Sequence, residues 1–224
     1  QDGQSSATTM AKIHIYDSMG EEKKALDELC ALADSHPLEL DYRTILGNWL
    51  FGKGRYKEAQ KEYSAVLAED PDNESAMISM IDYYQHEGQD SLAKDLHNRI
   101  LSSPKTQTET KAFMLRQAIR ASEQSNGDTT EILAKFDLAL QHKQTTTDLL
   151  DLKLAYMDLK KMSEQKQIEV LNQIIEVDPA NMAARNKLIY IISMREDTKE
   201  VIRLAQQSIQ FHPDKLIFRY YLAM

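Results

Sequence analysis

Apolar residues recur three and four positions apart along most of the chain, which is the spacing of one buried face on an α-helix. The pattern is clearest in residues 40–73, where two such runs are separated by Gly52 and Gly54 and are followed by Pro71. Glycine favours a change of chain direction, and proline cannot continue a helix interior. Residues 40–73 are therefore predicted to form a hairpin of two helices.

The same arrangement recurs on both sides of this hairpin. The chain has five prolines, and we expect all of them to follow second helices: Pro37, Pro71, Pro104, Pro179 and Pro213. Except between the third and the fourth, successive prolines are separated by about 34 residues. The longer interval exceeds two such units by seven, and this surplus is expected in polar connections. Helices inside that interval are predicted at residues 109–123, 129–141, 147–160 and 164–177.

The hairpin predicted at residues 40–73 contains seven residues at characteristic spacings: Arg43, Leu46, Gly47, Leu50, Ala59, Tyr63 and Pro71. This set resembles the tetratricopeptide repeat (TPR), a helix-turn-helix unit of about 34 residues. Gly47 and Ala59 are expected where the two helix backbones cross closely, since larger side chains would separate them. Arg43 departs from the large aromatic residue usual at its place. The resemblance implies an all-α fold, a right-handed superhelical solenoid of about six stacked helix hairpins plus a truncated seventh helix.

The predicted units form one array over residues 10–224. Their approximate bounds are 10–39, 40–73, 74–104, 105–143, 144–181, 182–215 and a partial unit at 216–224. Residues 1–9 lack an apolar pattern and are expected to be a flexible lead-in. A stacked array normally ends in a polar cap, and residues 216–224 begin a helix with nothing to cover it. We therefore expect the native protein to continue beyond Met224.

The start of the chain bears on its location. It begins at Gln1 rather than Met, as would follow either from signal-peptide cleavage or from a cloning boundary. The lead-in resembles the mature start of exported bacterial TPR proteins, which favours the bacterial periplasm or cell envelope over the cytoplasm. What precedes Gln1 would decide between these two explanations.

Composition excludes several functions. Hydrophobic residues make up 42% of the chain with only 7 Gly and 5 Pro, which fits a mostly helical protein. No apolar stretch reaches the length of roughly 18 residues that suggests a transmembrane helix, so no membrane span is predicted. The net charge of −8 argues against a general nucleic-acid binder. Counted by region, the charge is −9 in residues 1–104, −2 in 105–181 and +3 in 182–224.

Motifs for catalysis and cofactor binding are missing from the sequence. It contains no GxGxxG, Walker loop, HExxH or paired-cysteine motif. The 6 histidines are scattered and do not have the close spacing of a zinc site. Cys30 is the only cysteine, and its place near an apolar helix face favours a packed thiol over a nucleophile. We therefore predict a non-enzymatic protein with no cofactor, no metal and no catalytic residue.

A partner-binding groove is what the resemblance implies instead. In TPR arrays the first helices line a concave face that accepts a peptide or a partner protein. Carried over position by position, the groove residues are Asp41, Thr44, Asn48, Phe51, Ser75, Ile78, Asp82, Gln85, Asn186, Tyr190 and Ser193. This polar lining with a few apolar anchors suits an extended chain that buries one or two side chains.

One subset of TPR proteins holds the carboxylate end of chaperone tails in a clamp of Lys, Asn and Arg. Asn48 matches one clamp place, but Thr44 stands where the lysine should be and Ser79 where the next asparagine should be. Without these charge-assisted bonds most of the binding energy is lost, which argues against chaperone C-terminal tails as partners. The leading interpretation is a protein-interaction scaffold. Its alternatives are a regulatory or docking segment of a longer enzyme and an envelope assembly module of a bacterium.

Overall fold

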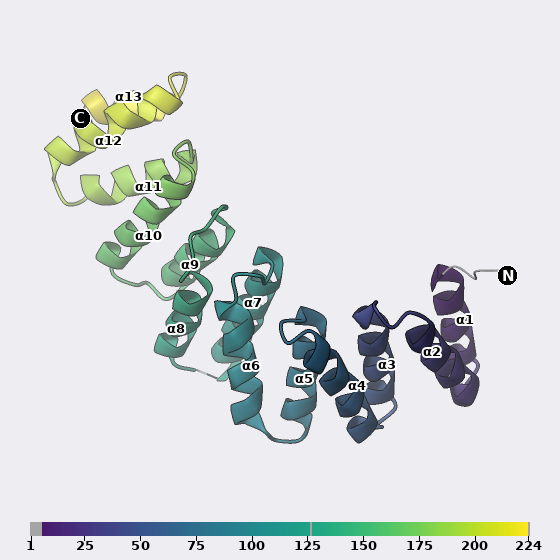
Figure 1. Ribbon diagram of the computed structural model, residues 1–224. Coiled ribbons are helices and arrows are strands. Elements are labelled where there is room, and N and C mark those ends of the chain that lie inside the picture. Colours follow the sequence, from purple (N-terminus) through teal and green to yellow (C-terminus); the bar gives the residue numbers. More distant parts are fainter. Residues whose placement is uncertain (1–5, 126, 224) are drawn as a thin grey trace. The chain divides into compact units, whose positions relative to one another are not determined.

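The computed structural model of the chain describes residues 6–125 and 127–223, and every regular element in these ranges is an α-helix. The helices follow one another as pairs (Figure 1). The pairs are α1 (Ser6–Ser18) with α2 (Glu22–Ser35), α3 (Leu40–Gly52) with α4 (Tyr56–Glu69), α5 (Glu74–His86) with α6 (Asp90–Ser102), α7 (Thr108–Ser125) with α8 (Thr129–Ala139), α9 (Asp148–Leu159) with α10 (Glu164–Val177), and α11 (Met182–Ser193) with α12 (Thr198–Phe211), before α13 (Leu216–Ala223). The predicted all-α fold of helix hairpins is confirmed.

The starts of the first helices show where the repeat is regular. They begin at residues 40, 74 and 108 in steps of 34, then at 148 after a step of 40, and then at 182 and 216 in steps of 34 again. The surplus therefore lies in the hairpin of α7 and α8. Part of it lengthens α7 to 18 residues, and part forms the connection of residues 140–147. The prediction that all of it lies in connections was wrong, because residues 108–125 contain no Gly or Pro that would end the helix earlier.

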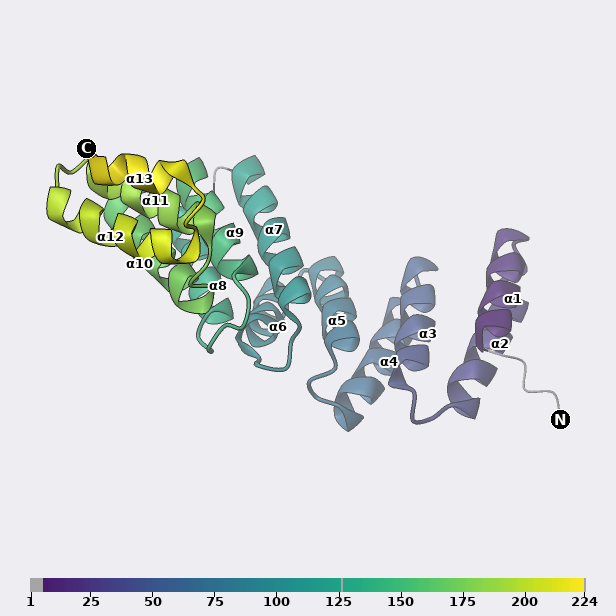
Figure 2. The same cartoon turned by 90° about the horizontal axis from the view of Figure 1, so that it is seen from above.

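The chain divides into two compact units, one ending at Ile100 and the other beginning at Leu101, within α6. In the first unit, helices α1 to α5 pack in chain order, and the first helices α3 and α5 also touch each other. In the second unit, helices α7 to α13 pack in the same manner, with α13 against α11 and α12 (Figure 2). That residues 10–224 form one continuous array stays a prediction.

The amino-terminal helix begins earlier than predicted. Residues 6–9, which we expected in a flexible lead-in, belong to α1, and the side chain of Thr9 is buried. Ala7 is a strong helix former, and a single buried threonine leaves no apolar periodicity in so short a stretch. Residues 1–5 of the expected lead-in lie outside the described residues.

Close packing of α3 on α4 depends on Gly47. A Cβ atom placed there would lie 2.4 Å from Cε1 of Tyr63, whose ring is fully buried. Ala59 on α4 is also fully buried, as are its equivalents in the neighbouring hairpins, Ala25 and Ala93. Gly47 therefore leaves room for the Tyr63 ring of α4, and the close crossing of the two backbones at Gly47 and Ala59 stays a prediction. A small residue on each helix lets the large ring fill the interface without a void.

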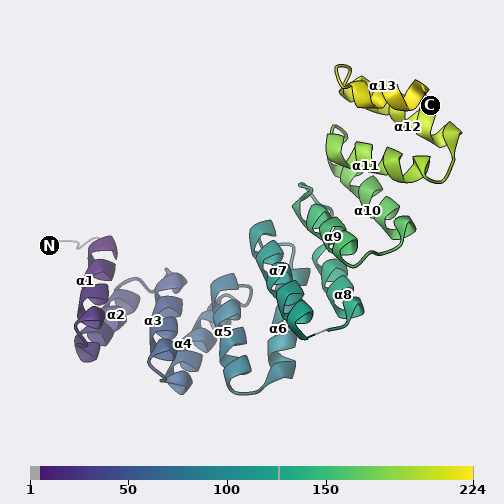
Figure 3. The same cartoon turned by 180° about the vertical axis from the view of Figure 1, so that it is seen from behind.

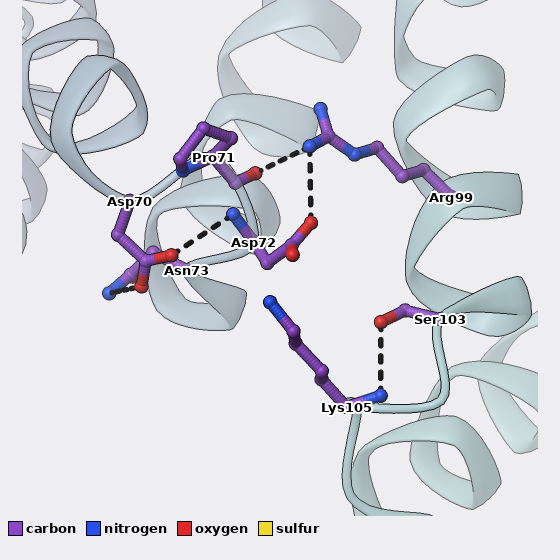
Figure 4. Close-up of polar contacts among 7 residues, drawn as sticks. All are labelled: Asp70, Pro71, Asp72, Asn73, Arg99, Ser103 and Lys105. Atoms are coloured by element: carbon purple, nitrogen blue, oxygen red, sulfur yellow. Dashed lines mark hydrogen bonds and ion pairs between the residues drawn. The ribbon is translucent and has the colours of Figure 1, made fainter.

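All five prolines follow second helices, as predicted. Each lies two residues beyond the last helical residue of α2, α4, α6, α10 or α12. The turn between α4 and α5 shows how one such proline is held (Figure 4). The Asp72 N–H donates to Oδ1 of Asp70 at 3.2 Å, and the Arg99 guanidinium of α6 donates to the Pro71 carbonyl at 2.8 Å and to Asp72 Oδ1 at 3.2 Å. Arg99 thereby ties α6 to the turn that precedes its own hairpin.

An asparagine at the end of this turn caps the next helix. Oδ1 of Asn73 accepts the Ala76 N–H at 3.0 Å, and Oδ1 of Asn181 accepts the Ala184 N–H at 3.0 Å. Both bonds satisfy a free N–H group of the first helical turn. The two asparagines occupy the same place in their units, so the cap is a repeated feature.

The joints between first and second helices differ in the two units. Gly20, Gly54 and Gly88 have φ angles of 74°, 74° and 69°, which glycine adopts without strain. In the second unit, Lys161 and Glu196 hold φ angles of 50° and 60° at the corresponding joints. Side chains with a Cβ reach this conformation only at a cost, so the second unit keeps the turn without its usual residue.

Candidate functional site

Five of the predicted groove residues are exposed on α3 and α5, the touching first helices of the first unit. They are Asp41 and Asn48 on α3, and Ser75, Asp82 and Gln85 on α5. Asp41 and Ser75 are separated by one repeat of about 34 residues, as are Asn48 and Asp82, so equivalent positions of two hairpins carry these polar groups. We call the exposed residues of these two helices the α3–α5 surface.

Thr44 was wrongly placed in the groove. Its side chain is only 3% exposed, and its hydroxyl donates to the Leu40 carbonyl at 3.4 Å. A threonine can satisfy its own hydroxyl on the preceding helical turn, and it can therefore be buried where a lysine could not. Ile78, the equivalent residue of α5, is half-buried.

Phe51 is half-buried in an aromatic cluster at one end of α3. Its ring centroid lies 5.1 Å from that of Tyr56 and 5.8 Å from that of His86, and the last two rings are 3.7 Å apart. Edge-to-face contacts of this kind fix the ring orientations. Phe51 is therefore partly exposed and partly packed against these two rings.

Asn48 is held in place by the buried ring of the second helix. The Tyr63 hydroxyl donates to Asn48 Oδ1 at 2.9 Å. Burial raises the pKa of Tyr63 to about 12, so the phenol stays protonated and donates at neutral pH. This bond fixes the orientation of the Asn48 side chain. No described residue accepts a hydrogen bond from its amide N–H groups.

Asp82 lacks a cationic partner among the described residues. Its side chain reaches solvent, but protein atoms on one side desolvate the carboxylate and raise its pKa. Helix α5 contains no Lys or Arg, and the lysine of α1 and the arginine of α3 are engaged elsewhere. Lys12 pairs with Glu28, and Arg43 pairs with Glu62 at 3.2 Å. The α3–α5 surface is therefore negative at a point where no internal cation neutralises it.

The raised pKa of Asp82 predicts a pH-dependent effect on stability. A carboxyl whose pKa is higher in the folded state disfavours folding when ionised, and this cost vanishes below its unfolded pKa. We expect Asp82→Asn to raise the unfolding temperature at about pH 7 and to have little effect at about pH 3. Thermal unfolding followed by circular dichroism at both pH values measures this, with Asp41→Asn as the control. A lower unfolding temperature of Asp82→Asn at neutral pH would contradict it.

The remaining three predicted residues form a set of their own on α11, in the second unit. Tyr190 is 53% exposed, and the Ser193 hydroxyl donates to its carbonyl at 2.7 Å. Asn186 is half-buried, and its Oδ1 has no hydrogen-bond partner among the described residues. Of this set, Tyr190 is exposed, whereas Asn186 and Ser193 are half-buried.

The described parts of the chain show neither a metal-binding cluster nor an activated thiol. No group of three or more His, Cys, Asp or Glu side chains there could hold a metal ion. Cys30 is half-buried, and burial raises the pKa of its thiol, which disfavours the reactive thiolate. Among residues 6–125 and 127–223, no helix combines the length and the apolar character that crossing a bilayer requires.

Comparisons with known proteins found distant likenesses to solved structures and no family match. No protein-family model and no curated protein matches the chain. Similar solved structures include YrrB, a TPR protein with an unusual peptide-binding site, at 12% identity over 88% of this chain and 98% of that chain, with a TM-score of 0.42. A TPR protein from Parabacteroides merdae is 18% identical over 99% of this chain and 72% of that one, with a TM-score of 0.42. Yeast Tom70 is 15% identical over 96% of this chain and 46% of that one, with a TM-score of 0.46.

The spacing and the packing of the helix hairpins are the main evidence for a TPR-type fold. From α3 onward, all but one of the steps between first helices equal the TPR period of about 34 residues. Gly47 lies against the ring of Tyr63, and both Ala59 and Tyr63 are fully buried. The fold is that of TPR-type helix hairpins.

Proposed function

We propose that the chain is an interaction scaffold whose α3–α5 surface binds an extended peptide segment of a partner protein. The observation that carries this proposal is the pair Asn48 and Asp82. The two residues occupy equivalent places on touching helices, one held by Tyr63 and the other without a counter-ion. Groups that are fixed and unsatisfied in the free protein are suited to satisfy a ligand.

The chemistry of the surface indicates which peptide it would take. Residues 1–100 contain 10 Lys and Arg against 19 Asp and Glu, a net charge of −9. A segment with a lysine or arginine would neutralise Asp82, and the amide groups of Asn48 and Gln85 would bond its main chain. The half-buried Ile78 and Phe51 would contact an apolar side chain. Electrostatic attraction of this kind favours basic segments and weakens as salt rises.

The test uses a displayed library of random peptides selected on the immobilised chain. We expect the selected peptides to be enriched in Lys and Arg and to lose affinity for the Asn48→Ala/Asp82→Ala variant. A hydrogen bond to a charged group contributes about 1.5–3 kcal/mol, so the loss should be about tenfold or more. Isothermal calorimetry with one selected peptide gives the affinities, and circular dichroism verifies that both proteins keep their helix content.

A matched control removes the same two kinds of side chain elsewhere in the first unit. Gln89 and Asp95 are exposed and lie outside α3 and α5. Gln89→Ala/Asp95→Ala should bind the selected peptides as the unchanged chain does. Equal affinity of all three proteins would refute the assignment of the α3–α5 surface.

A further inference from the structure

The second unit contains a cavity of about 740 Å³ that the sequence did not predict. Its walls come from the end of α8, the connection of residues 140–147, the first helix α9 and the second helix α10, which follow one another in Figure 3. The volume is in the range of ligand-binding cavities, roughly 300–1,000 Å³. It involves none of the eleven predicted groove residues.

The irregular step of the repeat produces this cavity. The other connections from a second helix to the next first helix are shorter. Those at 36–39, 70–73, 178–181 and 212–215 have four residues and that at 103–107 has five, whereas residues 140–147 number eight. The longer connection is braced by side chains. The Ser102 carbonyl accepts from Gln141 Nε2 at 2.6 Å and lies 3.1 Å from His142 Nε2, and Gln144 Nε2 donates to the His142 carbonyl at 2.5 Å. These bonds hold the connection at the rim of the cavity.

The walls combine an aliphatic part with polar groups of both signs. Leu140, Leu150 and Val177 supply the aliphatic part. Lys153 pairs with Asp137 at 2.8 Å, so these two charges neutralise each other. A polyanion such as a nucleic acid would need an excess of cations in these walls, and they do not have one.

Three further groups in the walls are free to bind a ligand. The Lys143 ammonium and the Glu176 carboxylate form no ion pair with any described residue, and the Gln173 amide forms no hydrogen bond with one. A glutamine amide presents a donor and an acceptor side by side, which matches the C=O and N–H of a peptide group. Opposite charges nearby would favour a segment that carries both signs.

We propose that this cavity is a second peptide-binding site, which takes a short segment of a partner protein. An aliphatic side chain of the segment would contact Leu140, Leu150 and Val177, and Gln173 would bond its main chain. Charged groups of the segment would pair with Lys143 and Glu176. The site is built mainly by second helices and a connection, and it does not depend on the α3–α5 surface.

The test selects random displayed peptides on the full chain and compares variants that fill or strip the cavity. Thr145 and Gln173 line the cavity and are exposed, so Thr145→Trp should block it and Gln173→Ala should remove a main-chain partner. The neighbouring Thr146→Trp and Asn172→Ala change exposed residues that do not line it.

We expect one class of selected peptides to bind with dissociation constants of about 1–100 μM. This class should lose about tenfold or more in affinity with Thr145→Trp and with Gln173→Ala. The two neighbouring variants and Asn48→Ala/Asp82→Ala should leave its affinity unchanged, which separates this site from the α3–α5 surface. Hydrogen exchange should show peptide-dependent protection of residues 140–147.

Two results would overturn the proposal. One is that every peptide selected on the unchanged chain binds Thr145→Trp and Gln173→Ala equally well. The other is that random oligonucleotides, rather than peptides, bind in a manner that Thr145→Trp abolishes. Because Gln173→Ala adds no bulk to the fold, its outcome decides the matter if Thr145→Trp disturbs the connection.

Discussion

Replacing Phe136 with alanine is expected to lower the free energy of unfolding by about 3–5 kcal/mol, the usual cost of deleting a fully buried aromatic ring. Phe136 on α8 is 0% exposed and takes the place in its hairpin that Tyr63 takes on α4. Its ring centroid lies 6.1 Å from that of Tyr156 on α9. The hairpin would therefore lose the buried side chain at its centre and a contact with the next hairpin.

A matched control lies in the same hairpin. Phe113 on α7 is 55% exposed, so Phe113→Ala should cost about 1 kcal/mol or less. Urea unfolding followed by circular dichroism measures both variants. The single tryptophan, Trp49, lies in the first unit and reports separately on that unit. Equal losses from the two substitutions would contradict the packing described for α8.

Replacing Gly47 with leucine is expected to destabilise the first unit by about 3 kcal/mol, at the upper end of overpacking costs. A Cβ at Gly47 would meet Tyr63 Cε1 at 2.4 Å and Cδ1 at 2.8 Å. The ring cannot turn away freely, because it is buried and its hydroxyl is bonded to Asn48. Leucine is a better helix former than glycine by about 0.8 kcal/mol, which offsets only part of the clash.

The same substitution five residues later provides the control. A Cβ at Gly52, the last residue of α3, would meet no atom within 4 Å. Gly52→Leu should therefore change stability by about 1 kcal/mol or less. Trp49 fluorescence in urea compares the two variants. In a Tyr63→Leu background, Gly47→Leu should lower the free energy of unfolding by less than it does in the unchanged chain. An equal loss in both backgrounds would show that the Tyr63 ring is not the obstacle.

Much of the fold could be predicted because local signals agreed with one another. The helix predicted at residues 164–177 has these bounds in the structure, and the other three helices of the long interval differ by at most two residues at either end. Apolar periodicity and polar connections indicated the same ends, and Pro179 marked the end of the last of these helices. The joints of the second unit gave weaker signals, because Lys161 and Glu196 adopt the conformation that glycine takes in the first unit.

The candidate site could be predicted only by position. Carrying a groove pattern onto the chain located Asn48 and Asp82, but it could not show that Thr44 turns inward to bond its own helix. The bond from Tyr63 to Asn48 and the desolvation of Asp82 arise between helices and leave no trace in local sequence. The surplus length between Pro104 and Pro179 was the one sequence signal of the cavity, and by itself it indicated only a longer connection.

If the proposed partner binds beside the unneutralised carboxylate of Asp82, complex formation would also raise the stability of the protein. A ligand that binds only the folded state stabilises it by mass action, and one that supplies the missing cation would also remove the electrostatic cost of Asp82. The uncomplexed chain would then open more often and be degraded sooner. Supply of the partner would thus regulate how much of this protein a cell retains.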